Sequence, residues 1–96
     1  MAIAELTDKE RNDAMAALGG WTYDADAKAI RRSFRFPDFA EAFAFMTRIA
    51  IVAEKMDHHP EWFNVYGTVD IALTTHDASG LSLRDIDLAT QIDSFV

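Results

Sequence analysis

The chain alternates between stretches in which every second residue is hydrophobic and stretches in which hydrophobic residues return every three or four positions. Segments 21–24 and 30–36 have the two-residue period, which predicts a β-hairpin with one solvent-exposed face. Arg32 is the exception, because it shares the apolar side of its strand, and a strand end or edge position would let its guanidinium reach water. Upstream, Thr7-Asp8-Lys9-Glu10 has the form of a capping box and Gly19-Gly20 supplies a stop, so a first helix is predicted between them.

The longest predicted element is a second helix, which follows Pro37, has Asp38 as its cap and runs to Met56. Its apolar residues form two stripes, one through Phe39, Phe43, Met46, Ala50 and Ala53, and one through Phe45, Ile49, Val52 and Met56. One face of a sheet cannot bury both stripes, so we predict that this helix contributes to a symmetric interface. We expect the stripe through Phe45 and Ile49 to face away from the sheet.

A second hairpin is predicted from strands at 62–66 and 69–75, joined around Tyr66-Gly67-Thr68, with His76 continuing the polar side of the second strand. Ser82-Leu83-Arg84-Asp85 repeats the capping-box pattern and opens a third helix. The order is helix, two strands, helix, two strands, helix. We therefore predict one α+β domain, residues 1–96, with an antiparallel sheet and three helices packed on one face.

Composition excludes several classes of function. The 16 acidic residues outnumber the 9 basic ones, and the resulting net charge of −7 repels phosphate backbones, so no nucleic acid partner is expected. The absence of cysteine rules out a disulfide framework, a thiolate metal site and a cysteine nucleophile. Residues 1–5 lack the basic flank and apolar run of a signal peptide, and no later stretch can span a bilayer. We therefore expect a cytoplasmic protein with no membrane partner.

The candidate chemistry is concentrated in three histidines that lie between positions 58 and 76. His58 and His59 are adjacent where the long helix should end, and Pro60 disfavours helical geometry at His59, so their rings are expected to point apart. His76 ends a strand that pairs with the strand after Pro60, so all three histidines can meet at one edge of the sheet. Imidazoles titrate near neutrality, and rings in one cleft can therefore serve as acid and base at the same pH.

Two other interpretations of the histidines remain open on spacing alone. His58-His59 can be a helix C-terminal cap favoured by the helix dipole, with His76 a solvated strand-end residue. Three imidazoles can also bind zinc with an open coordination position, although adjacent histidines rarely bind the same ion well. We predict no metal site.

Several neighbouring side chains have a structural and a functional interpretation. Asp85 can serve the third helix's capping box alone. Glu54 lies one turn before His58 and can orient that ring, or it can belong to the polar stripe of its helix. Trp62 and Phe63 point to opposite faces of their strand, so one is core while the other can stack on a planar ligand.

The motif Glu54-x-x-x-His58-His59-Pro60, followed by Tyr66, His76 and Asp85, resembles the pterin-4a-carbinolamine dehydratase family. The likeness is strongest over residues 53–66, continues in 45–48 and 80–86, and runs from the first helix to the last. The resemblance implies a four-stranded antiparallel sheet that carries three helices on one face. Periodicity and capping patterns independently predict the same architecture.

The resemblance also implies an activity, the dehydration of 4a-hydroxytetrahydrobiopterin or a related tetrahydropterin to the quinonoid dihydropterin, in the regeneration cycle of aromatic amino acid hydroxylases. The catalytic residues it implies are His58, His59 and His76, with His58 and His76 as the acid–base pair and His59 orienting the ring. The substrate-binding residues it implies are Glu54, Asp57, Trp62, Thr74, Thr75, Asp77 and Asp85. No metal or organic cofactor is implied.

The same resemblance offers a second function. Animal relatives also act as dimerisation partners of a homeodomain transcription factor, and that role uses a helix surface and not the histidines. The alternative is therefore a non-catalytic dimeric binding module or transcriptional coregulator. In either case we expect a homodimer or homotetramer, because a domain of this size buries a modest core of its own.

Overall fold

The computed structural model describes residues 3–96, which form three α-helices, four β-strands and one short 3-10 helix. The elements are α1 (Asp8–Ala17), β1 (Thr22–Asp24), β2 (Ala29–Arg35), α2 (Phe39–Met56), β3 (Glu61–Val65), β4 (Thr68–Leu73), η1 (His76–Ala78) and α3 (Leu83–Asp93). This order confirms the predicted α+β class. None of the helices in residues 3–96 is long and apolar enough to cross a membrane. Residues 1 and 2, which contribute to the expectation that the chain has no signal peptide, lie outside the described residues.

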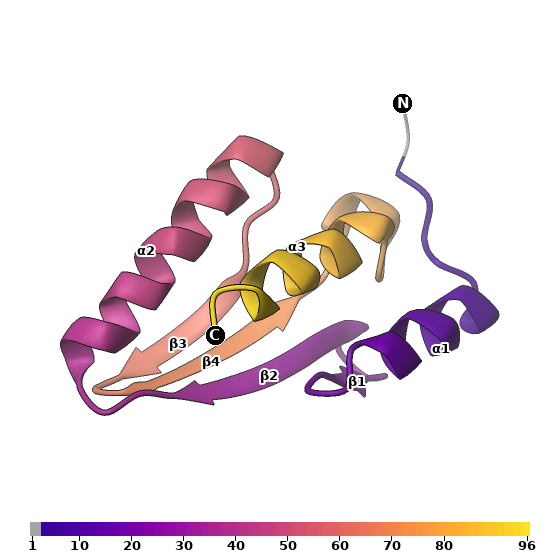
Figure 1. The fold of residues 1–96 in the computed structure, drawn as a ribbon. Coiled ribbons are helices and arrows are strands. Elements are labelled where there is room, and N and C mark those ends of the chain that lie inside the picture. The colour runs from indigo at the N-terminus through magenta and orange to yellow at the C-terminus, as the bar shows by residue number, and fades with distance from the viewer. Residues whose placement is uncertain (1–2) are drawn as a thin grey trace.

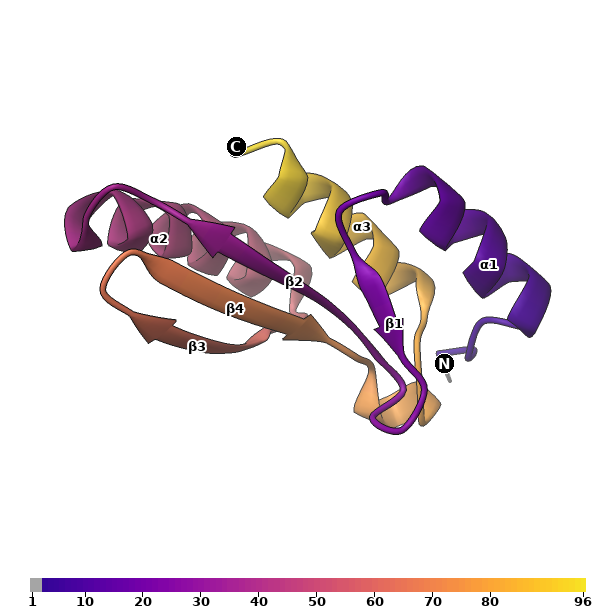
Figure 2. The same ribbon diagram turned by 90° about the horizontal axis from the view of Figure 1, so that it is seen from below.

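The four strands form one antiparallel sheet in the order β1-β2-β4-β3 (Figure 1). The helices lie on one side of this sheet and leave the other side open (Figure 2). Residues that alternate along β2 and β4 fill the core on the helix side, namely Ile30, Phe34, Val69, Ile71 and Leu73. The residues between them, such as Arg31, Ser33 and Asp70, are exposed on the open side. The predicted layers are therefore confirmed.

The orientation of α2 is the reverse of our expectation. Phe45 and Ile49 are 3% and 0% exposed, and the Phe45 ring packs 4.8 Å from the ring centroids of both Phe34 and Phe36. Phe39 and Phe43, on the other stripe, are half exposed and pack on each other at 5.6 Å. The prediction was wrong because both stripes are apolar enough to face a core. Contact with the aromatic residues of β2 and the segment after it decides between them.

Arg32 has no strand beside it on the β1 side, because β1 pairs only with Ala29–Arg31, and its side chain is 29% exposed, as an edge position predicts. Its Nη1 donates to Asp93 Oδ1 at 2.8 Å, and its guanidinium lies 4.5 Å from the Phe34 ring centroid. The Trp21 indole Nε1 donates to the same carboxylate oxygen at 2.9 Å. The Arg32 guanidinium, on the helix side of the sheet, is therefore paired with a carboxylate of α3, and this charged hydrogen bond links the helix to the sheet.

The second hairpin differs from the prediction at its end. β4 stops at Leu73, and the chain then closes a small loop in which Thr75 pairs with Gly80 in an isolated β-bridge. His76 opens η1 inside this loop and does not continue the strand. The alternation of polar and apolar residues does not reveal where β4 ends. Thr75 is buried because its hydroxyl contacts Asp85 of α3, ten residues further along the chain.

We predict that Phe45→Ala lowers the free energy of unfolding by about 3–5 kcal/mol, because it leaves a cavity against the β2 aromatics. Phe63→Ala is the matched control, since Phe63 is 65% exposed on the open side of the sheet, and it should change stability by less than about 0.5 kcal/mol. Urea titration followed by circular dichroism measures both. Equal losses in the two variants would contradict the observed orientation of α2.

Candidate active site

A cleft of about 230 Å³ lies where the C-terminal end of α2 meets the loop after β4. Its lining residues are Ile3, Asp57, His58, His59, Thr74, Thr75, His76, Asp77 and Arg84. The pairing of β3 with β4, which sets Glu61 opposite Ala72, brings the ends of the two strands to the same edge. All three histidines consequently line one cleft, although they are up to 18 positions apart in the sequence.

The end of α2 explains why the two adjacent histidines point apart. Asp57, the helix C-cap, has a left-handed backbone with φ 53°, a conformation that aspartate tolerates better than most residues. The His58 amide still donates to the Ala53 carbonyl at 3.0 Å. The chain then leaves the helix, so the His58 ring is buried while the His59 ring is exposed. The predicted divergence of the two rings is confirmed.

His58 lies against a buried carboxylate. Its Nε2 is 2.6 Å from Asp85 Oδ1, and the two residues are 8% and 0% exposed. The other carboxylate oxygen, Oδ2, accepts from the Thr75 hydroxyl at 2.7 Å and from the Ser82 amide at 3.0 Å. The contact with Ser82 is half of the α3 capping box. Asp85 therefore serves the helix cap and the histidine at the same time, and the two interpretations of its role do not exclude each other.

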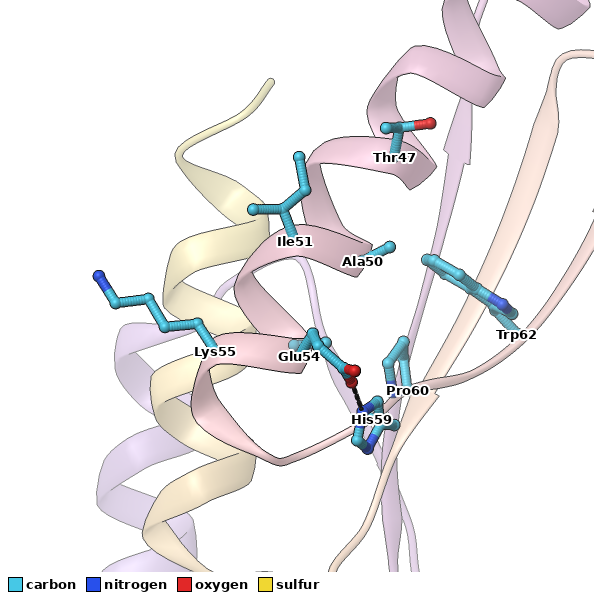
Figure 3. A pocket seen from close by; sticks show the side chains of 9 residues that line it. Thr47, Ala50, Ile51, Glu54, Lys55, His59, Pro60 and Trp62 are labelled. Carbon is cyan, nitrogen blue, oxygen red and sulfur yellow. Dashed lines mark hydrogen bonds and ion pairs between the residues drawn. The ribbon is translucent and has the colours of Figure 1, made fainter.

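The other two histidines also meet carboxylates through Nε2, but both pairs are exposed. His59 lies 2.7 Å from Glu54 Oε1 (Figure 3), and His76 lies 3.2 Å from Glu61 Oε2. The expectation that Glu54 can orient His58 was wrong, because the left-handed turn at Asp57 swings His58 away from the helix face that carries Glu54. Each imidazole thus has one acidic partner.

A second hollow, of about 750 Å³, lies between α2 and the start of β3 (Figure 3). We call it the α2–β3 groove, and its lining residues are Thr47, Ala50, Ile51, Ala53, Glu54, Lys55, His59, Pro60 and Trp62. The groove is larger than the cleft, yet it is mostly apolar and contains a single histidine. Proton transfer needs titratable groups on both sides of the reacting bond, so the smaller cleft is the better candidate for chemistry.

The structure separates the predicted site residues into three groups. Seven of them line the cleft, namely Asp57, His58, His59, Thr74, Thr75, His76 and Asp77. Asp85 lies beneath His58 and is fully buried, whereas Glu54 and Trp62 line the α2–β3 groove. Within residues 3–96 no three His, Asp or Glu side chains are arranged to hold a metal ion.

Three residues at the site were missed by sequence reasoning. Arg84 lines the cleft and precedes Asp85 in a segment that the family resemblance already covered, so it could have been included. Glu61 follows Pro60 and lies near His76. The strand pairing would have predicted this if the end of β4 had been known from the sequence. Ile3 reaches the cleft from the N-terminal segment, and no sequence pattern marks it.

Comparison with known proteins identifies one family. Residues 4–95 match the sequence profile described as pterin 4 alpha carbinolamine dehydratase. A relative from Rhizorhabdus wittichii is 62% identical over 98% of this chain and 97% of its own length. A relative from Novosphingobium aromaticivorans is 55% identical over the full length of both chains. The name of both relatives, pterin-4-alpha-carbinolamine dehydratase, is itself provisional.

Two solved structures share the fold. A crystal structure from Brucella melitensis, described as a transcriptional coactivator/pterin dehydratase, has a TM-score of 0.91 and 47% identity, and the match covers 95% of this chain and 97% of that one. A pterin dehydratase-like protein, described as a RuBisCO assembly factor of the alpha-carboxysome, has a TM-score of 0.68 at 23% identity, covering 79% and 88% of the two chains. The second likeness concerns the fold alone.

We predict that Asp85→Ala lowers the free energy of unfolding by roughly 3–5 kcal/mol, because it leaves His58, Thr75 and the Ser82 amide without their buried acceptor. Asp87→Ala removes an exposed carboxylate from the same helix and should cost no more than about 0.5 kcal/mol. Chemical denaturation at neutral pH tests the pair. A loss for Asp85→Ala no larger than that for Asp87→Ala would show that the buried carboxylate does not organise the site.

Proposed function

This chain belongs to the pterin-4-alpha-carbinolamine dehydratase family, and we propose that it removes water from 4a-hydroxytetrahydrobiopterin or a related tetrahydropterin to give the quinonoid dihydropterin. The observation that carries the proposal is the convergence of three histidines, each beside a carboxylate, on one cleft. Tetrahydrobiopterin recycling and a cytoplasmic location belong to the same proposal.

The reaction needs an acid and a base at the same time. The hydroxyl on C4a leaves as water only if it receives a proton, and the neighbouring ring nitrogen must lose one as the double bond forms. Two imidazoles can hold opposite protonation states near neutral pH and so perform both transfers without a cofactor. We assign this pair to His58 and His76, which reach the cleft from α2 and η1, and we assign His59 to binding and orienting the ring.

The remaining cleft residues suit a flat, neutral heterocycle. Asp57, Thr74 and Asp77 bring polar groups to the lining, and a pterin ring has amide-like edges that need hydrogen bonds more than a basic pocket. The net charge of −7 is therefore no obstacle. Glu54 acts through His59 in this proposal, and Trp62 borders the same groove as Glu54.

The second candidate function is a binding role that does not use the histidines. The α2–β3 groove and the half-exposed Phe39 and Phe43 give α2 an apolar outer surface, and the description of the Brucella melitensis structure names a transcriptional coactivator. A coregulator role would require this surface and would leave dehydratase activity dispensable. Assay of the purified protein for dehydration of a 4a-hydroxytetrahydropterin separates the two functions directly.

Self-association is compatible with both functions, and we propose a homodimer or homotetramer that uses the exposed apolar side chains of α2. Phe39, Phe43 and Ile51 are 49%, 55% and 66% exposed along one helix. If two α2 helices pack antiparallel about an axis near Thr47, Phe43 of one copy lies opposite Ile51 of the other. The aromatic rings of each copy would then cover the apolar end of the other copy's groove.

We predict that His58→Ala and His76→Ala each slow dehydration by roughly 10²- to 10⁴-fold, the usual contribution of a positioned acid or base. His59→Ala should instead raise KM and leave kcat near the wild-type value. Steady-state kinetics with a 4a-hydroxytetrahydropterin measures both effects.

Folding must be checked first by circular dichroism, because His58 is buried and its loss also removes a contact with Asp85. The double variant should lose less than the product of the two single losses, since acid and base act in one transition state. Wild-type rates in folded His58→Ala and His76→Ala proteins would refute the acid–base assignment and favour the binding role.

We predict that Phe43→Glu lowers the molar mass of the assembly, because it places a charge in the proposed apolar interface. Phe63→Glu carries the same change at a phenylalanine that is 65% exposed on the open side of the sheet, and it should leave the mass unchanged. Multi-angle light scattering at micromolar concentration measures both. A monomeric wild-type protein, or an unchanged mass for Phe43→Glu, would rule out this interface.

A further inference from the structure

The family resemblance assigns Thr75 to substrate binding, but its hydroxyl is already hydrogen-bonded within the protein. Thr75 borders the cleft but is only 4% exposed, and its hydroxyl bonds to Asp85 and Ser82. We infer that Thr75 is a positioning residue, whose hydroxyl holds the Asp85 carboxylate and, through it, the His58 imidazole. The inference rests on the proposed dehydratase function and deepens it, because it places Thr75 behind the acid–base pair and not against the substrate.

The direction of each hydrogen bond follows from the backbone amides, which can only donate, and from the carboxylate, which can only accept. The Arg84 amide donates to Ser82 Oγ at 3.2 Å, and Ser82 Oγ lies 2.7 Å from Thr75 Oγ1. Ser82 is the donor in this second contact, because the proton of Thr75 goes to the Asp85 carboxylate. Thr75 in turn has one proton, which it donates to Asp85 Oδ2 at 2.7 Å. The chain of donors therefore runs from the α3 N-terminus through two hydroxyls to the carboxylate. Thr75 has no proton left to offer a substrate.

The hydrogen bonds of Asp85 also determine which nitrogen of His58 carries the proton. A carboxylate has no proton to donate, so Asp85 Oδ1 accepts as Oδ2 does from Thr75 and from the Ser82 amide. The 2.6 Å contact between Asp85 Oδ1 and His58 Nε2 then requires the hydrogen to sit on Nε2. The lone pair available for proton transfer is on Nδ1. Thr75 and Ser82 hold this tautomer in place without touching the reacting atoms.

Thr75 also links the two proposed acid–base residues through its backbone. Its amide donates to the Gly80 carbonyl at 3.0 Å, and the Gly80 amide donates back at 3.3 Å. This bridge closes the loop whose first residue is His76. One residue therefore anchors the loop of His76 by its backbone and the orientation of His58 by its side chain.

The test compares Thr75→Val, which removes the hydroxyl at nearly constant shape, with Thr75→Ser, which keeps it. We expect Thr75→Val to lower kcat by roughly 10- to 100-fold, the value of one hydrogen bond to a charged group, and to change KM by less than about twofold. Thr75→Ser should recover most of the lost rate. Thr90→Val is the control, because it removes an exposed threonine hydroxyl from the same α3 that carries Asp85.

A second measurement does not depend on activity. Long-range ¹H–¹⁵N NMR of the imidazoles should show His58 protonated on Nε2 in the wild-type protein, with a changed His58 signal in Thr75→Val and an unchanged one in Thr90→Val. Asp85→Asn should move the proton to Nδ1, because the amide can present a donor to Nε2 while its oxygen still accepts from Ser82 and Thr75.

The possible outcomes separate this inference from the proposed function. A raised KM at constant kcat in Thr75→Val would show that Thr75 contacts the substrate, and unchanged kinetics would show that its hydroxyl is dispensable; either result overturns the inference. If Thr75→Val does not fold, retention of the Nε2 proton in Asp85→Asn overturns it instead. If the wild-type protein lacks dehydratase activity, the proposed function fails, and the NMR comparison still decides whether the donor chain sets the tautomer.

Discussion

The site depends on one buried carboxylate, that of Asp85, whose hydrogen bonds come from several segments of the chain. Asp85 belongs to α3, but its carboxylate oxygens accept hydrogen bonds from residues of other segments. These are His58 after α2 and Thr75 after β4, in addition to the amide of Ser82. A buried charge is tolerated only when its hydrogen bonds are complete, so these elements must be in their native places together. The helix cap, the position of Thr75 and the orientation of His58 therefore depend on the same carboxylate.

The three histidine–carboxylate pairs differ in how firmly they are held. The side chains of His58 and Asp85 are 8% and 0% exposed, whereas those of His59 and Glu54 are 56% and 82% exposed, and those of His76 and Glu61 are 84% and 61% exposed. Exposed pairs are screened by solvent and constrain a ring weakly. The structure thus combines one rigid imidazole with two that can adapt to a ligand, a division that suits a cleft in which one group is preorganised and others adjust on binding.

His59 is the one histidine shared by the cleft and the α2–β3 groove. A molecule seated in the groove would lie beside the Glu54–His59 pair, so the proposed assembly surface on α2 and the cleft meet at His59. The proposed acid–base pair lines the cleft, and the exposed Phe43 and Ile51 lie on the outer surface of α2.

The sequence by itself determined the element order, the two hairpins, the helix caps at Thr7, Asp38 and Ser82, and the meeting of the histidines, because these follow from residues close together in the chain and from strand pairing. Resemblance added the family. Only the tertiary structure decided which stripe of α2 is buried, that Arg32 pairs with Asp93, and that Glu54 meets His59. Local patterns do not decide between such choices, because the Arg32–Asp93 pair joins residues 61 positions apart and the Glu54–His59 pair depends on the left-handed turn at Asp57.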